Sequence, residues 1–148
     1  MRTPLLAALV LSLLAGCSGD VPEPLPDGQV RATLDGVELL LEVADDERER
    51  AVGLMRRSSV PPGTGMVFLY DEPVESRFYM YDVQVPLRAV FVRDGRVVLS
   101  VLMPPCEKGL APQECPTYGP DEPFDTVVET APETLPDVQP GDRLELAR

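Results

Sequence analysis

Apolar and polar residues alternate along several short runs of the chain, and each run is bounded by turn residues. Residues 30–34 form one run and residues 37–43 another, with Asp35-Gly36 between them. Alternation with a period of two is typical of a half-buried strand, and Asp-Gly is a strong signal for a two-residue hairpin turn. The pattern therefore predicts a β-hairpin over residues 29–43.

The same reasoning predicts four later strands. Residues 89–92 and 97–101 lie on either side of a second Asp-Gly pair at positions 94–95, which predicts another hairpin. Residues 124–129 and 143–146 are apolar-rich runs next to proline and glycine, and each predicts a further strand.

A helical pattern occurs in residues 45–55. Asp46 and Glu49 fit a capping box, and the acidic residues of this first turn stand at the positive end of the helix dipole. Apolar residues within 51–55 supply the face that would pack on a core. We expect one short helix here.

The predicted elements together indicate a mostly-β protein. Roughly seven short strands, turn signals between them and no alternation of strands with helices favour an antiparallel sandwich or a partly open barrel, jelly-roll-like, with one short helix. Residues 65–101 hold six of the eight aromatic residues of the chain. Because aromatic side chains bury the most apolar area, we expect this stretch to organise the core and any binding site.

The N-terminus reads as a targeting segment. Residues 1–16 combine a positive charge at Arg2 with an apolar run too short to span a bilayer, as in a signal peptide. The run ends in Leu14-Ala15-Gly16-Cys17, which resembles the lipobox of bacterial lipoproteins. The resemblance implies a lipid on the Cys17 thiol, with several acyl chains anchoring the protein to a membrane. The alternative is an ordinary signal peptide in which the cysteine has no role.

The remainder of the chain divides into a tether and a domain. Residues 17–28 are rich in proline, which predicts a short, stiff tether after the lipidated cysteine. Residues 29–148 are expected to form a single β domain. This organisation predicts an extracytoplasmic protein that is lipid-anchored to a bacterial membrane.

Composition limits the chemistry that the chain can carry. The sequence has no histidine, which excludes a Ser-His-Asp or Cys-His mechanism and removes the commonest ligand for zinc and copper. A net charge of −12 argues against binding to nucleic acid, because that requires a basic face. We therefore expect no cofactor, no metal site and no nucleic-acid partner.

The two remaining cysteines, Cys106 and Cys115, are expected to form a disulfide, since an exported domain folds in an oxidising compartment. The alternative is a redox or metal site. Their spacing is wider than the Cys-x-x-Cys of redox motifs, and no histidine accompanies them, so we favour the structural bond.

A series of short blocks between residues 53 and 146 points to a known family. The blocks are Gly53-Leu54-Met55-Arg56, Gly65-Met66-Val67-Phe68, Phe78-Tyr79-Met80-Tyr81-Asp82-Val83, Pro86-Leu87, Asp94-Gly95-Arg96-Val97, Pro105-Cys106, Cys115-Pro116-Thr117-Tyr118, Glu129 and Gly141-Asp142. In order and spacing they are similar to the domain-of-unknown-function 192 family of bacterial and archaeal proteins. The resemblance implies a compact, mostly-β, jelly-roll-like domain that is often exported, and it implies no established activity.

The chain departs from the family pattern in the aromatic block. The family typically has Phe-Trp-Met-Lys-Asn-Thr there, and Pro-Leu-Asp shortly afterwards. This chain has Tyr79, Tyr81, Asp82 and Val83 in place of Trp, Lys, Asn and Thr, and Arg88 in place of the final Asp. Any chemistry that the family performs with those side chains would be lost or rewired here.

The same block supplies the candidate binding residues. If residues 78–83 form a strand, Tyr79 and Tyr81 share one face and could stack against a sugar or an aromatic ligand; alternatively they cover the sheet. Asp82 could pair with Arg56 or Arg88 beside these tyrosines. Such a pair could bind a polar ligand, or Asp82 could act as an acid; alternatively the pair is a structural salt bridge.

These observations favour a ligand- or partner-binding module at the cell envelope, acting on an unknown small ligand or an envelope protein and attached to the membrane through its N-terminal lipid. We lean against an enzyme, and the catalytic residues of one are unknown. Two alternatives stay open. One is a hydrolase or lyase that uses Asp82 with a tyrosine and an arginine. The other is an assembly factor for another envelope protein, which would present a flat, exposed apolar patch.

Overall fold

The computed structural model describes residues 25–147 of the chain. The predicted signal peptide over residues 1–16, the lipidated Cys17 and most of the tether therefore lie outside the described residues. In the described part, no helix is long and apolar enough to cross a membrane.

Strands are the main regular secondary structure of the described residues, which also contain one α-helix and one 3₁₀ turn. The elements are β1 (Gln29–Leu34), β2 (Val37–Ala44), α1 (Glu47–Val52), β3 (Thr64–Val74), β4 (Phe78–Tyr79), β5 (Leu87–Arg93), β6 (Arg96–Met103), η1 (Pro112–Glu114), β7 (Thr117–Tyr118), β8 (Phe124–Thr130) and β9 (Leu144–Leu146). The prediction of a mostly-β protein with one short helix is confirmed.

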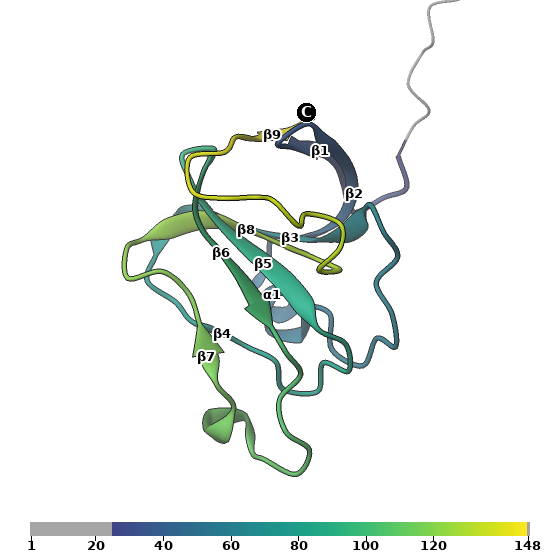
Figure 1. Ribbon diagram of the computed structural model, residues 1–148, viewed down its shortest axis with the longest axis vertical. Coiled ribbons are helices and arrows are strands. Elements are labelled where there is room, and N and C mark those ends of the chain that lie inside the picture. The colour runs from purple at the N-terminus through teal and green to yellow at the C-terminus, as the bar shows by residue number, and fades with distance from the viewer. Residues whose placement is uncertain (1–24, 148) are drawn as a thin grey trace, which may run out of the picture.

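Seven strands form one curled sheet in the order β6-β5-β8-β3-β2-β1-β9. Figure 1 shows the sheet curling over at the end formed by β1, β2 and β9. There the outer strand β6 meets the segment just before β9, the other outer strand: the Gly141 N–H donates to the Val97 carbonyl at 2.8 Å, and the Val97 N–H donates to the Asp142 carbonyl at 2.9 Å. The sheet is thus a partly open barrel, one of the two architectures expected.

One pairing differs from the antiparallel expectation. β2 and β3 run parallel, with Leu41 opposite Gly65, so the sheet is mixed. A parallel pair needs a crossover connection, and residues 45–63, which include α1, supply it. The sequence shows the helix between the two strands, but the direction of their pairing depends on the course of the crossover.

Both predicted hairpins are present. β1 pairs with β2 and β5 with β6, each antiparallel. The turn residues all have positive φ, at 48° for Asp35, 77° for Gly36, 50° for Asp94 and 73° for Gly95. Positive φ at both central residues is the geometry that makes Asp-Gly a favoured hairpin turn.

The predicted helix is also present, although shorter than its pattern. The Glu49 backbone N–H donates to Asp46 Oδ1 at 2.7 Å, which satisfies one of the free N–H groups of the first turn. The Glu49 carboxylate in turn accepts from the Asp45 N–H at 3.2 Å. Gly53, with φ of 47°, ends the helix after six residues.

The sheet separates two apolar cores, because neighbouring residues of a strand point to opposite faces. On β8, Val128 packs with Val67 and Val90 in one core. Val127 packs in the other with Phe91, and with Leu54 from the segment just after α1. This second core carries the candidate site.

Four phenylalanines meet edge to face in the second core. The Phe78 ring lies 5.1 Å from that of Phe68 and 5.4 Å from that of Phe91, and Phe91 lies 5.0 Å from Phe124. Such pairs add about 0.5–1.5 kcal/mol each beyond the area they bury. The prediction that residues 65–101 organise the core is therefore confirmed for three of these four rings.

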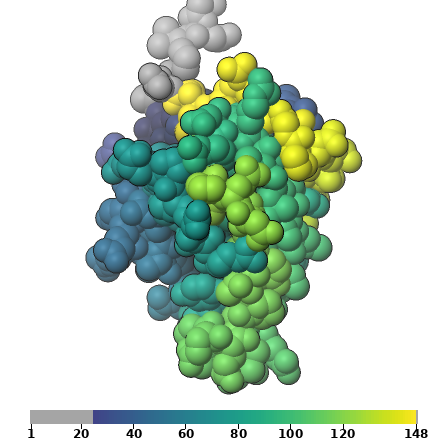
Figure 2. All heavy atoms as spheres, turned by 90° about the vertical axis from the view of Figure 1, so that its left-hand side faces the viewer, coloured from purple at the N-terminus to yellow at the C-terminus, as the bar shows by residue number. Residues whose placement is uncertain are grey.

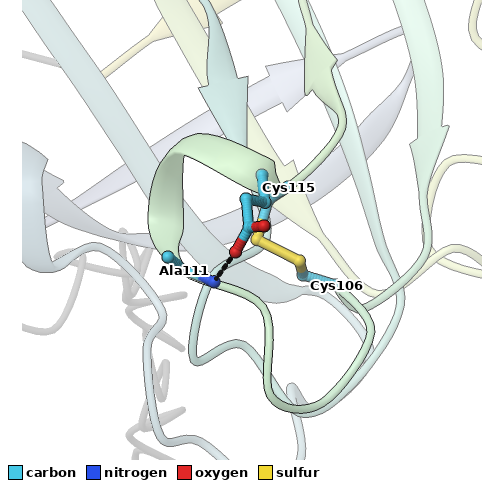
Figure 3. Close-up of a disulfide and its surroundings, with 4 residues drawn as sticks. Cys106, Ala111 and Cys115 are labelled. Carbon is cyan, nitrogen blue, oxygen red and sulfur yellow. Dashed lines mark hydrogen bonds between the residues drawn. A yellow bond between two sulfur atoms is a disulfide. The ribbon is translucent and has the colours of Figure 1, made fainter.

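A disulfide between Cys106 and Cys115 closes the loop after β6, as predicted (Figure 3). Inside the loop the Ala111 N–H donates to the Glu114 carboxylate at 2.7 Å. Figure 2 shows the green loop as the lower end of the molecule. Closing a loop of this length stabilises the fold by about 3 kcal/mol in the chain-entropy model. The bond joins the start of the loop, after β6, to its end just before β7, the strand that pairs with β4.

The predicted strand over residues 78–83 is wrong beyond Tyr79. β4 contains only Phe78 and Tyr79, and a turn follows it. Asp82 has a φ of 57°, which a strand cannot contain. The alternation therefore breaks, and the faces assigned to the residues after Tyr79 do not apply.

Candidate functional site

A pocket of about 230 Å³ opens beside the end of α1, over the second core. We call it the aromatic pocket. Its lining residues are Arg50, Ala51, Val52, Gly53, Leu54, Met55, Phe68, Tyr70, Ser76, Arg77, Phe78, Tyr79, Val83 and Glu129. The buried Leu54, Phe68 and Glu129 form its inner wall, whereas the exposed Val52 and Tyr79 stand at its rim.

The sheet carries Glu129 into this wall. It lies on β8 opposite Met66 of β3 and Ala89 of β5, and it shares its face with Val127 of the second core. Strand alternation therefore places a carboxyl where every neighbouring position on the face is apolar. Glu129 is 5% exposed.

Burial governs the charge of Glu129. Removal of the carboxyl from water disfavours its ionised form and raises its pKa from an ordinary value of 4.5 to about 8. The side chain is thus predominantly uncharged at neutral pH. A neutral carboxyl can donate one hydrogen bond and accept another, so Glu129 offers the pocket a fixed donor.

Tyr70 lies next to this carboxyl, and Arg50 lies over the Tyr70 ring. The Arg50 guanidinium lies 4.9 Å from the centre of the Tyr70 ring and donates to the Leu69 carbonyl at 2.9 Å and to the Asp45 carbonyl. Burial raises the pKa of the Tyr70 hydroxyl, Arg50 lowers it and Glu129 raises it further. The pocket therefore combines aromatic surface, one cation and one protonated acid.

The predicted tyrosine platform does not form. Tyr79 is 40% exposed at the rim of the aromatic pocket. Tyr81 and Asp82 instead line a second cleft of about 740 Å³, which lies against residues 105–110 of the disulfide loop. The reason is the turn after β4, which sends Tyr81 to a different surface from Tyr79.

Asp82 pairs with Arg56 at the surface. Arg56 Nε lies 3.5 Å from Asp82 Oδ2, and the Arg56 backbone N–H donates to the Asp82 carbonyl at 2.7 Å. The two side chains are 73% and 45% exposed, so water screens the pair, which contributes at most about 1 kcal/mol. The backbone bond ties the end of the helical segment to the turn after β4, and the pair reads as structural.

Arg88 lies apart from these groups. Its guanidinium donates to Ser100 Oγ at 3.1 Å and approaches the Pro132 carbonyl at 3.5 Å, and it lines neither of the two pockets. Asp82, Tyr81 and Arg88 therefore do not converge on one cleft, which the hydrolase or lyase alternative requires. Within residues 25–147, no cluster of three or more acidic or cysteine side chains could hold a metal ion.

Exposed apolar side chains also gather at the aromatic pocket. In the described part of the chain, the large apolar residues that are most exposed are Val52, Tyr79 and Leu102. The first two border the pocket and only Leu102 lies elsewhere. The exposed apolar residues thus border a pocket. They do not form the flat apolar patch that an assembly factor would present.

The sequence reasoning missed Glu129, Tyr70 and Arg50 as members of one site. In the sequence analysis, Glu129 was noted only as one of the blocks that resemble the family. The strand pattern gave no signal, because Glu129 alternates onto the same face as Asp125 and Val127, and two acids among three residues predict an exposed face.

Comparison with known proteins places the chain among others of the same fold. Residues 30–146 match the model of the DUF192 family, described as "Uncharacterized ACR". The structure is similar to that of a candidate transcription regulator from Sinorhizobium meliloti 1021, with a TM-score of 0.68 and 28% identity over 80% of this chain and 92% of that one. It is also similar to a protein of unknown function from Novosphingobium aromaticivorans DSM 12444, with a TM-score of 0.61 and 27% identity over 79% of this chain and 83% of that one. No curated protein matches the chain.

Proposed function

The chain belongs to the DUF192 family, and on that premise we propose that this member is a lipid-anchored protein of the bacterial cell envelope that binds a small ligand in the aromatic pocket. One observation carries the proposal: a buried glutamic acid lines a pocket whose other walls are mainly apolar and aromatic. Pockets of this composition, with a few convergent polar groups and a titratable group of shifted pKa, are typical of binding sites.

The energetics of Glu129 support a role in binding. Burying a carboxyl without a compensating partner destabilises a fold, and an apolar residue at the same position would avoid that loss. The sheet already has apolar neighbours at Met66 and Ala89, so packing alone gives no reason for an acid there. A ligand that hydrogen-bonds to the carboxyl would offset this loss.

The position in the envelope rests on the N-terminal sequence. The lipobox-like Leu14-Ala15-Gly16-Cys17 favours a lipid anchor, and a disulfide between Cys106 and Cys115 is typical of proteins that fold outside the reducing cytoplasm. The acidic composition favours a small ligand over nucleic acid.

Blocking the pocket is the direct test of binding. Ser76→Trp places a large ring at an exposed position on the pocket lining. We expect ligands found by thermal shift on the full-length protein in detergent to lose at least about tenfold in affinity in this variant, because the ring occupies their site. Ser58→Trp, at an exposed position that is not part of this lining, is the matched control and should bind as the parent does. Equal affinity in both variants would place the ligand elsewhere.

The anchor has a separate test. Cys17→Ala removes the thiol that would carry the lipid, so we expect the protein to move from the membrane fraction to the soluble fraction and to lose incorporation of a labelled fatty acid. Fractionation and labelling of cells that express each form provide the measurement. If the variant stayed in the membrane and took up label like the parent, the lipoprotein assignment would be wrong.

A further inference from the structure

The size of the aromatic pocket restricts its occupant. At about 230 Å³ it is smaller than the roughly 300–1,000 Å³ of pockets for drug-sized molecules. Rings from Phe68, Tyr70, Phe78 and Tyr79 line it. Its ligand is therefore a small molecule with an apolar body, and Glu129 determines which polar group that body carries.

Charged and titratable groups reach the pocket from several elements. Besides Glu129 on β8, they are Arg50 on α1, Tyr70 on β3, Arg77 in the segment before β4, and Tyr79 on β4. Phenolic side chains carry no charge at neutral pH, and Glu129 is predominantly protonated there. The fixed charges that a ligand meets are therefore the two guanidinium groups.

The two arginines are not equivalent. Arg77 lies 3.7 Å from the carboxylate of Asp121, which offsets part of its charge. Between residues 25 and 147, no carboxylate lies within 4.0 Å of the Arg50 guanidinium. Arg50 therefore lines the pocket as a cation that has no ion-pair partner among the described residues.

From these groups we infer that the pocket binds a small carboxylic acid in its anionic form. The ligand carboxylate accepts a hydrogen bond from protonated Glu129, its apolar body packs against Phe68 and Phe78, and the charge of Arg50 favours entry. The inference rests on the proposed binding function and specifies its ligand class. A hydrogen bond from a neutral carboxyl to a carboxylate is charge-assisted and stronger than one between neutral groups.

An organic cation fits less well, although aromatic rings and a carboxylate can together bind one. It would require ionised Glu129, which burial disfavours. The Tyr70 ring also has the Arg50 guanidinium 4.9 Å from its centre, and that charge would repel a second cation. The two ligand classes predict opposite pH dependences, which makes them separable.

Calorimetric titration of the full-length protein in detergent with three probes tests the inference. Phenylacetate, phenylacetamide and 2-phenylethylamine share a phenyl group and are anionic, neutral and cationic. We expect phenylacetate to bind most tightly at pH 7. Its Kd should rise about tenfold between pH 7 and pH 9, because binding requires the proton that Glu129 loses near pH 8. Binding at pH 9 should also take up a proton from the buffer.

Two variants complete the design. Glu129→Gln keeps a donor at the position but cannot titrate, so its affinity for phenylacetate should be independent of pH and proton uptake should vanish. Glu122→Gln changes an exposed glutamate just before β8 and should keep the parental pH profile. A preference for 2-phenylethylamine that strengthens with pH would overturn the carboxylate inference while leaving the binding function intact. Absence of binding by all three probes, together with a silent thermal-shift screen, would overturn both.

Discussion

Glu129→Gln is expected to stabilise the protein by a margin that grows with pH. Below about pH 4.5 the carboxyl is protonated in both the folded and the unfolded chain, so its burial carries no ionisation penalty. Between pH 4.5 and 8 the unfolded chain releases the proton that the folded protein retains, and the free energy of unfolding falls as pH rises. Above pH 8 the loss is complete.

The shift from 4.5 to about 8 corresponds to about 5 kcal/mol in total. We therefore expect the difference in unfolding free energy between Glu129→Gln and the parent to increase by about that amount from pH 4 to pH 8. Denaturant unfolding at a series of pH values measures it. Glu122→Gln, at an exposed position, is the control. Its difference in unfolding free energy from the parent should not change with pH. A flat difference for Glu129→Gln as well would mean that the buried carboxyl finds a partner when ionised.

Gly65→Ala is expected to prevent folding or to destabilise the protein by more than about 4 kcal/mol. A Cβ at this position would lie 2.0 Å from the backbone carbonyl oxygen of Glu129. The backbone of β3 determines the position of this Cβ and the carbonyl belongs to the backbone of β8, where Thr130 lies opposite Gly65, so neither atom can rotate away. The strands would have to separate at the centre of the sheet.

Urea unfolding and near-ultraviolet circular dichroism measure the effect of Gly65→Ala. Gly109→Ala in the disulfide loop is the comparison, since a Cβ there meets nothing within 4 Å. Its φ of 92° still disfavours alanine, so a loss of about 1 kcal/mol is expected. If Gly65→Ala lost no more than this control, the close packing of β3 against β8 would be in error.

Local chemistry explains which parts of the fold could be predicted. The turns at Asp35-Gly36 and Asp94-Gly95 were predictable because their backbone geometry is determined by the residues themselves. The cap at Asp46 was predictable for the same reason. The parallel pairing of β2 with β3 was not, because it depends on where a crossover of about twenty residues brings the chain back.

The candidate site shows the same division. Residues 78–83 were treated as one strand because their pattern alternates, but Asp82 adopts a left-handed conformation that alternation does not reveal. Glu129 and Arg50 are far apart in sequence and reach one pocket only through the sheet and the helix. Burial of Glu129 is a property of the assembled core, so its shifted pKa could not be predicted from its neighbours in the chain.

The central position of β8 has a consequence for the order in which the protein can acquire its fold. β8 lies between β5 and β3, so Met66 reaches its partner Glu129 only after most of the chain has been synthesised. Pairings between such distant segments form slowly. The first hundred residues alone leave the facing edges of β3 and β5 unpaired, and the barrel cannot close. For a protein that is exported, as we propose, the sheet can therefore be completed only once β8 has been synthesised.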